Sequence, residues 1–187
     1  MAPGGIGRLA EFPPSRANPG DRRAALFARP ANCCARGETM HRDDDAFFVE
    51  ETYRAACRGR DAGGIPIGAV LVRDGAVIGT GCNQRIQKSD PILHGEMDCI
   101  RNAGRQRTYR DTTLYTSLSP CLMCAGTIVQ FKIPRVVIGE NITFSGNEAF
   151  LASHGVEVAV LNDQRFVDVM QAFITARPTD WNEDIGE

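Results

Sequence analysis

Two short strings in the sequence combine side chains that bind metal ions. The first is His-Gly-Glu at 94–96, and the second is Pro-Cys-Leu-Met-Cys at 120–124. Together they supply one imidazole, two thiols and one carboxylate, all of which are zinc ligand types. Cys121 and Cys124 are three residues apart, so on the first turn of a helix both sulfur atoms point to one side and can hold one ion. A helix N-terminus also lowers the pKa of a thiol, which favours the thiolate that a metal requires.

The number of ligands indicates a catalytic zinc site rather than a structural one. His94, at the start of another predicted helix, completes a set of three with Cys121 and Cys124. A structural site uses a fourth Cys or His, whereas a catalytic site leaves that position for water. Glu96 is placed beside this water, whose pKa zinc can bring to about 7, and its carboxylate can take and return the proton. His-x-Glu with Pro-Cys-x-x-Cys is typical of zinc-dependent nucleobase deaminases.

Simpler interpretations of each string are open when the string is taken alone. Cys-x-x-Cys also occurs in redox pairs and in structural zinc knuckles, and His94 with Glu96 could be an ordinary capped helix start. The combination of the two strings favours the catalytic zinc site over each of these. The remaining cysteines have no such neighbours and are interpreted as tail or core thiols. They are Cys33, Cys34, Cys57, Cys82 and Cys99.

The segments around the two strings alternate between helical and strand patterns. Helical spacing of apolar residues runs from residue 45 to the glycines at 59–64, and recurs at 94–103, 121–131, 148–153 and 164–177. Strand patterns occur at 67–72, 76–80, 112–117, 135–138 and 156–161. Asp74-Gly75 between the first two strands is a hairpin signal, and residues 83–90 form a polar stretch. This order predicts an α/β fold, a three-layer α/β/α sandwich with a central mixed sheet.

Composition divides the 187 residues into a basic extension and an acidic domain. Residues 1–39 contain six Arg, three acidic residues and five of the ten Pro, so they carry +3, and the five prolines oppose the amphipathic helix of a transit peptide. We expect a disordered extension there. Because the full chain carries −2, residues 40–187 carry −5. They are long enough to bury a sizeable core and are expected to form the zinc-dependent deaminase domain.

Charge, hydropathy and cysteine content exclude several classes of partner. A domain charge of −5 argues against a phosphate-binding track for nucleic acid and against an anionic membrane surface. No apolar run approaches the ~18 residues of a membrane span, and the N-terminus has no secretory h-region. Seven cysteines are an odd number and too few for a disulfide scaffold, so a reducing compartment is expected. We therefore expect a cytoplasmic protein with a small, neutral substrate.

Further strings resemble the fungal type of cytosine deaminase, a member of the cytidine-deaminase-like superfamily. The resemblance covers about residues 44–187 and includes Gly-Gly-Ile-Pro-Ile-Gly at 63–68, Leu-His-Gly-Glu at 93–96, Asp-Thr-Thr-Leu-Tyr-Thr at 111–116, Leu-Ser-Pro-Cys at 118–121, Asp-Trp at 180–181 and Glu-Asp-Ile-Gly-Glu at 183–187. Zinc deaminases in general share the metal strings. The short acidic tail, by contrast, is similar to the lid and base-reading element of this one family.

The resemblance implies a small homodimer that hydrolyses free cytosine to uracil and ammonia in pyrimidine salvage, with one Zn²⁺ per chain. Zinc on His94, Cys121 and Cys124 would carry the hydroxide that attacks C4 of the base. Glu96 would move a proton to ring N3 and later to the departing amine.

The resemblance also implies how the base is held. The Asn83 side chain and the Gly95 backbone N–H would bind the base carbonyl, the Ser119 carbonyl would accept the exocyclic amine, and Asp184 would accept the ring N1–H. A nucleoside carries a sugar at N1, and a buried unpaired carboxylate is costly, so the free base is favoured. The side chains that enclose the base would be Phe144, Trp181 and Ile67. Without the resemblance, Asn83 could equally be a turn residue, Trp181 a tail anchor and Asp184 a solvated acid.

The chain departs from the family in places, and other functions remain open. Where the family has an aromatic residue after Asn-x-Arg, this chain has Ile86, which predicts a pocket of different size. Ile86 therefore keeps open a related aminohydrolase for another small ring, such as guanine or creatinine. A tRNA-editing deaminase needs a basic surface, which the acidic domain disfavours. A non-enzymatic zinc-stabilised interaction module would be excluded by an open coordination position beside Glu96.

Overall fold

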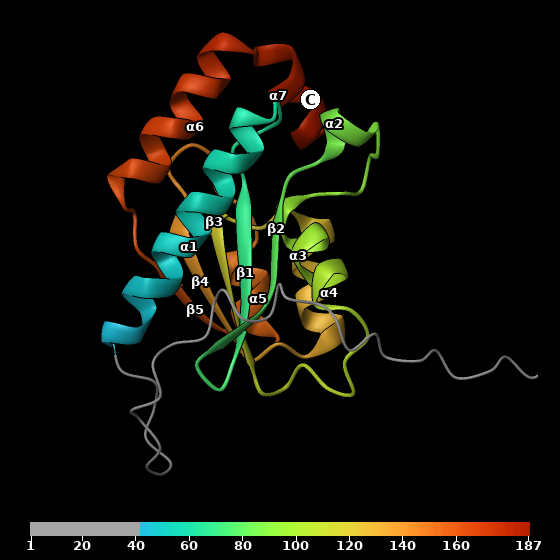
Figure 1. The fold of residues 1–187 in the computed structure, drawn as a ribbon, viewed down its shortest axis with the longest axis vertical. Coiled ribbons are helices and arrows are strands. Elements are labelled where there is room, and N and C mark those ends of the chain that lie inside the picture. The colour runs from blue at the N-terminus through green and yellow to red at the C-terminus, as the bar shows by residue number, and fades with distance from the viewer. Residues whose placement is uncertain (1–41) are drawn as a thin grey trace, which may run out of the picture. The chain divides into compact units, whose positions relative to one another are not determined.

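A computed structural model of the protein describes residues 42–187 and contains one five-stranded sheet (Figure 1). The strands are β1 (Gly68–Arg73), β2 (Ala76–Cys82), β3 (Thr112–Leu118), β4 (Arg135–Glu140) and β5 (Glu157–Val160). Their order is β2-β1-β3-β4-β5, with β1 antiparallel to both of its neighbours and β3, β4 and β5 parallel. The sheet is therefore mixed, as predicted. The extension expected at residues 1–39 lies outside the described residues.

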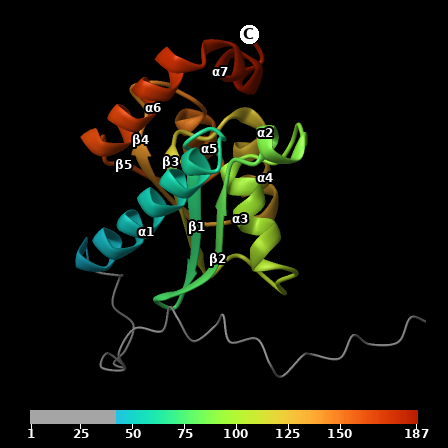
Figure 2. The same ribbon diagram turned by 45° about the horizontal axis from the view of Figure 1, so that its top comes forward.

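Helices cover both faces of the sheet. They are α1 (Arg42–Asp61), α2 (Arg85–Lys88), α3 (Gly95–Ala103), α4 (Leu122–Phe131), α5 (Glu148–Ser153), α6 (Gln164–Ala176) and α7 (Pro178–Ile185). On one face, Phe48 of α1 and Phe166 of α6 pack against Val70. On the other, α3, α4 and α5 pack against alternate residues of the same strands, such as Leu71 and Leu114. Figures 1 and 2 show these layers, and the prediction of a three-layer α/β/α sandwich is confirmed.

The local signals explain most of the element boundaries. Asp74 and Gly75 have φ angles of 50° and 72°, the two positive values that the predicted hairpin turn requires. The N-caps of α3 and α4 are His94 and Cys121, so both helices begin directly at the predicted metal ligands. The side chain of Asp163 caps α6 by accepting from the backbone N–H of Arg165, as its position predicts.

Two helices lie where the sequence analysis expected none. The polar stretch at 83–90 contains α2, whose single turn is too short to show a hydrophobic period. Pro178 ends α6, as predicted, but it is also the first residue of α7. Proline suits the first position of a helix because the N–H it lacks would have no partner there. None of the helices in the described part of the chain is long and apolar enough to cross a bilayer.

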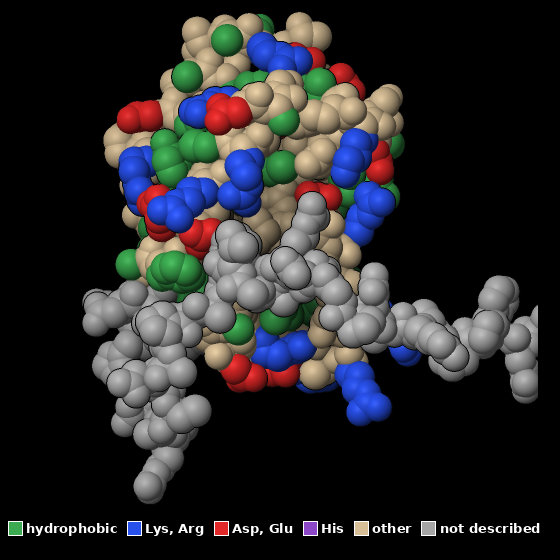
Figure 3. Space-filling model, viewed as in Figure 1, with side chains coloured by type: hydrophobic (Ala, Val, Ile, Leu, Met, Phe, Trp, Pro, Cys, Tyr) green, Lys and Arg blue, Asp and Glu red, His purple; other side chains and the backbone are tan. Residues whose placement is uncertain are grey.

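The face drawn in Figure 3 mixes charges of both signs. Basic and acidic side chains lie next to one another over much of the described surface that is visible there. Ion pairs of this kind occur among the described residues, as in the contacts of Arg165 with Glu50 at 2.8 Å and with Asp163 at 2.7 Å. This face therefore offers no continuous basic track among its visible described residues.

The position of α3, which carries the first metal-binding string, depends on close contact with β2. A side chain at Gly81 of β2 would overlap the backbone of Asp98 and Cys99. The backbone N–H of Cys82 donates to the buried Asp98 carboxylate at 3.2 Å, which joins the end of β2 to the same helix. The absence of a side chain at residue 81 therefore sets the distance between helix and sheet.

We predict that Gly81→Ala lowers the free energy of unfolding by about 2 kcal/mol, because the added methyl group forces α3 away from β2. The measurement is chemical denaturation of the purified variant. Gly126→Ala on α4 is the matched control, because a methyl group there meets no atom within 4 Å. It should be neutral or stabilise by up to about 1 kcal/mol. An equal effect of both substitutions would contradict the proposed close contact.

Candidate metal centre and active site

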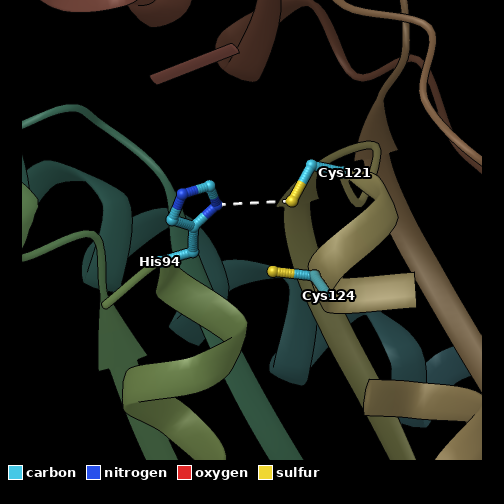
Figure 4. Close-up of side chains that lie close together, drawn as sticks. All are labelled: His94, Cys121 and Cys124. Atoms are coloured by element: carbon cyan, nitrogen blue, oxygen red, sulfur yellow. Dashed lines mark hydrogen bonds between the residues drawn. The ribbon is translucent and has the colours of Figure 1, made fainter. Parts of the chain in front are cut away.

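The three predicted metal ligands converge at the N-termini of two helices (Figure 4). His94 is the N-cap of α3, Cys121 is the N-cap of α4, and Cys124 lies on the first turn of α4. Their ligand atoms all lie within 4.8 Å of one another, and Sγ of Cys121 is 3.5 Å from Nδ1 of His94. His94 is 7% exposed and Cys124 is 1% exposed, so the group is largely shielded from water. Two sulfur atoms and one imidazole nitrogen at this separation fit one Zn²⁺ ion with one coordination position left open.

The pKa values of the two thiols are shifted in opposite directions. A hydrogen bond from Cys124 lowers the pKa of Cys121 to about 4, although burial opposes the shift. The hydrogen bond to Cys121 and burial together raise the pKa of Cys124 well above its usual value. One sulfur is thus already the thiolate that a metal requires, while the other must lose its proton when a metal binds.

Glu96 lies beside the ligand group, on the first turn of α3. Its side chain is buried, with Oε2 3.5 Å from Sγ of Cys124 and Oε1 3.3 Å from the hydroxyl of Thr116. Burial raises the pKa of Glu96 to about 6. A carboxyl group with a pKa near neutrality can both take up and release a proton. The position therefore suits proton transfer beside a metal ion held by the three ligands.

A small cavity of about 20 Å³ adjoins the ligand group. It is lined by Ile67, His94, Glu96, Leu118, Ser119, Cys121, Phe144, Trp181, Asp184 and Ile185. Five of the seven residues expected to hold or enclose a base are among these. The other two adjoin the lining, because Asn83 donates to Asp184 at 2.9 Å and Gly95 packs against the Ile67 backbone. The structure thus brings all of the predicted site residues together.

Two aromatic residues from separate segments line the cavity. The rings of Phe144 and Trp181 meet edge to face, with their centroids 5.9 Å apart. The loop that carries Phe144 is held by the buried carboxylate of Glu140, which accepts from the backbone N–H groups of Ile142 at 2.6 Å and Thr143 at 2.9 Å and from the Thr143 hydroxyl. Glu140 is the last residue of β4, so the sheet itself positions the loop that carries Phe144.

Three further residues contribute to the site without having been expected to do so. Leu118 and Ile185 line the cavity. Arg85 donates to Asp184 at 3.0 Å and to Glu183 at 3.1 Å. Leu118 and Ile185 belong to strings that carried the family resemblance, but nothing in the local pattern distinguished them from ordinary core residues. Arg85 could not be paired with Asp184 from the sequence, because the two residues are 99 positions apart.

Two other features lie outside this cavity. Ile86 is 36% exposed on α2 and does not line the cavity, so the structure gives no direct contact through which it changes the pocket. A larger groove of about 510 Å³ lies between α1 and α6 and is lined by residues such as Tyr53, Val169 and Phe173. None of the three zinc ligands lines this groove, and its lining contains no pair of carboxyl groups.

Comparison with known proteins assigns the metal-binding strings to a family. Residues 42–140 match the family model of the cytidine and deoxycytidylate deaminase zinc-binding region. The chain is 50% identical over 147 residues to a cytosine deaminase of Candida albicans, and the match covers 77% of this chain and 98% of that protein. It is 39% identical over 105 residues to a tRNA-specific adenosine deaminase of Buchnera aphidicola, which covers 54% of this chain and 70% of that protein.

Solved structures share the fold. A chain from a study of A-to-I editing by tRNA:A34 deaminases has a TM-score of 0.56 and 28% identity, and the match covers 63% of this chain and 99% of that one. A guanine deaminase from Nitrosomonas europaea has a TM-score of 0.60 at 16% identity over 68% of this chain and 83% of that one, and this likeness shows the fold alone. The family match and the His-Cys-Cys group together support one Zn²⁺ per chain.

We predict that zinc binding weakens as the pH falls. The pKa of Cys124 is raised, so this thiol keeps its proton through neutral pH and zinc must displace it. Each proton released makes the apparent affinity fall about tenfold for every pH unit of acidification. Competition with a chromophoric chelator at pH 8, 7 and 6 measures this slope.

Matched cysteine variants provide the control. Cys124→Ala should lose the zinc that copurifies with the protein, whereas Cys99→Ala, at a buried position of α3, should keep one zinc per chain. Zinc content by atomic emission distinguishes the two. A zinc-loaded Cys124→Ala protein, or affinity that does not change with pH, would contradict the assignment of Cys124 as a ligand.

Proposed function

The chain belongs to the cytidine and deoxycytidylate deaminase family, and we propose that it hydrolyses free cytosine to uracil and ammonia. The similarity to the Candida albicans cytosine deaminase extends over 98% of that protein. The observation that carries the proposal is the position of the C-terminal segment of this chain. Its Asp184 side chain lines the same cavity as His94, Cys121 and Glu96.

Zinc, when bound by His94, Cys121 and Cys124, lowers the pKa of a water molecule toward neutrality and so supplies the nucleophile. The proton transfers fall to Glu96. Its carboxylate takes one proton from the attacking water and delivers it to ring N3. It then takes the proton of the hydroxyl newly added at C4 and passes it to the amine, as the C4–N bond breaks and the C4 carbonyl of uracil forms. The hydroxyl of Thr116 at 3.3 Å from Oε1 leaves Oε2 as the oxygen nearer the metal ligands.

The chain's own groups orient the base. The side-chain oxygen of Asn83 accepts from the backbone N–H of Arg85 at 3.1 Å, which fixes the amide with its NH₂ group toward Asp184. One N–H of Asn83 binds Asp184, and the second remains for the base carbonyl. The N–H of Gly95, the first residue of α3, lies at a helix N-terminus without an intrahelical partner and serves the same carbonyl. The backbone carbonyl of Ser119 accepts the exocyclic amine.

The aromatic residues of the cavity also bear on how the base enters. We propose that Phe144 and Trp181, which line the cavity together with Ile67, move apart to admit a base and then close around it. Closure excludes water and strengthens the interaction of Asp184 with a ring N1–H.

We further propose a homodimeric, cytoplasmic enzyme of pyrimidine salvage. Support for association comes from large apolar side chains that stay exposed next to the site segments, namely Ile92, Leu122 and Ile142. Support for a reducing compartment comes from Cys57, Cys82 and Cys99, which are free thiols.

We predict that purified protein with one zinc per chain releases ammonia from cytosine. Cytidine should react with a kcat/KM lower by at least about 10²-fold, because its N1 carries a sugar and offers no N–H to the oxygen of the buried Asp184 carboxylate that faces the base. A coupled ammonia assay across cytosine, cytidine, guanine and creatinine measures this. Release from guanine or creatinine but not from cytosine would make the substrate assignment wrong.

We predict that Glu96→Gln keeps zinc but lowers kcat by about 10²- to 10⁴-fold, because an amide cannot carry the proton. Steady-state kinetics, with zinc content determined on the same preparation, provide the measurement. Glu50→Gln on the exposed face of α1 is the control and should leave kcat unchanged. Full activity of the Glu96 variant would refute its role in proton transfer.

A further inference from the structure

A single buried polar cluster attaches the C-terminal helix α7 to the rest of the domain. The Asp184 side chain, 4% exposed, accepts through Oδ1 from Nδ2 of Asn83 at 2.9 Å and from Nη1 of Arg85 at 3.0 Å. Within residues 42–187, apart from the adjoining Arg177, the side-chain hydrogen bonds of α7 to other elements all end on Asn83 or Arg85. The other attachments of this helix are apolar and are made by Trp181 and Ile185.

Arg85 is the member of this cluster that balances charge. Its side chain is only 12% exposed, and its two terminal nitrogens bind Asp184 and the neighbouring Glu183 separately. A planar guanidinium donates in fixed directions, so contact with two successive carboxylates restricts both the position and the rotation of the helix that carries them. The neutral amide of Asn83 can orient the Asp184 carboxylate but cannot compensate its charge.

The same contacts decide which atom of Asp184 is available to a ligand. Both hydrogen bonds from Asn83 and Arg85 are made to Oδ1, and Nε2 of His94 lies 3.7 Å from that oxygen. Among the described residues, no donor reaches Oδ2. Because Asp184 lines the cavity, Oδ2 is the acceptor that remains for an N–H group of a bound base.

We propose that Arg85 is a positioning and specificity residue. Its contacts with Asp184 and Glu183, here called the latch, hold α7 over the cavity and orient Asp184 to accept the ring N–H of a free base. This inference rests on the proposed function for the identity of that base. Arg85 does not line the cavity, and it reaches the zinc ligands only through Asp184, whose Oδ1 lies 3.7 Å from Nε2 of His94. Its loss should therefore act on base binding and on closure of α7 more than on the chemical step.

The single tryptophan of the chain, Trp181, makes closure directly observable. It lies on α7 and is 6% exposed, so its fluorescence reports on the position of this helix without any substrate. In zinc-loaded Arg85→Gln we expect acrylamide quenching of Trp181 to rise about twofold. We expect the KM for cytosine to rise about tenfold or more, with kcat changed less than about threefold and one zinc retained per chain.

Two further variants show whether the guanidinium itself is needed. Arg85→Lys keeps the charge but cannot bind both carboxylates in the same way, so its KM and quenching should lie between those of wild type and Arg85→Gln. Arg101→Gln, an exposed arginine in the last turn of α3, should match wild type in both measurements. Unchanged quenching and KM in Arg85→Gln would overturn the proposal. So would a KM increase accompanied by equal losses of zinc and melting temperature in both Arg85 variants.

Failure of the latch and failure of the proposed function give different results. If wild-type protein does not deaminate cytosine but Arg85→Gln still exposes Trp181, the latch is supported and the substrate is wrong. If cytosine is turned over with the same KM by wild type and Arg85→Gln, and Trp181 stays shielded in both, the latch is wrong and the function stands.

Discussion

Three ligands from two separate helices must lie within reach of one metal ion, and most of this structure can be understood as the means of meeting that requirement. His94 begins α3 and Cys121 begins α4, and both helices start at the edge of the sheet where β3 ends. Ligand atoms within 4.8 Å of one another leave little tolerance for movement of either helix. The direct packing of α3 on β2, across Gly81, provides this rigidity.

The ligand group brings several ionisable side chains into a space shielded from water. For each of them, a pKa shift or an ion pair limits the cost of burying its charge. The pKa of the Cys121 thiol is lowered and that of the Cys124 thiol is raised, so Cys121 is the thiol that ionises first. Glu96 is buried, which raises its pKa to about 6 and suits it to exchange protons near neutral pH. Asp184 is compensated by Arg85. Burial therefore tunes the acids as well as excluding water.

The two segments that contribute aromatic residues to the site are attached to the domain in different ways. They are the loop that carries Phe144 and helix α7. The loop that carries Phe144 is fixed by Glu140 at the end of a central parallel strand. Helix α7 is the last element of the chain, and it contacts the domain through apolar packing of Trp181 and Ile185 and through the cluster around Asp184. The loop that carries Phe144 is thus attached directly to the sheet, whereas α7 is attached to other elements through a few side chains.

The sequence by itself determined the chemistry and most of the fold. Residue types and spacing predicted His94, Cys121 and Cys124 as ligands, because two cysteines three apart on a helix can hold one ion and the His-x-Glu string completes the set. The periods of the apolar residues predicted all five strands and the layered sandwich. The resemblance added Asp184 and the aromatic cover. Short helices escaped prediction, since α2 has too few residues to show a period and Pro178 can begin a helix as well as end one.

Only the tertiary structure decided which distant residues act together. Arg85 and Asp184 are 99 positions apart, and no local pattern links them, yet folding places their side chains 3.0 Å from each other. Glu140 and Phe144 likewise acquire their relation to the cavity only when β3 and β4 pair in parallel. Spacing along the chain fixes contacts within one element. Contacts between elements depend on how the sheet and its helices pack, because packing alone sets the distance across the cavity.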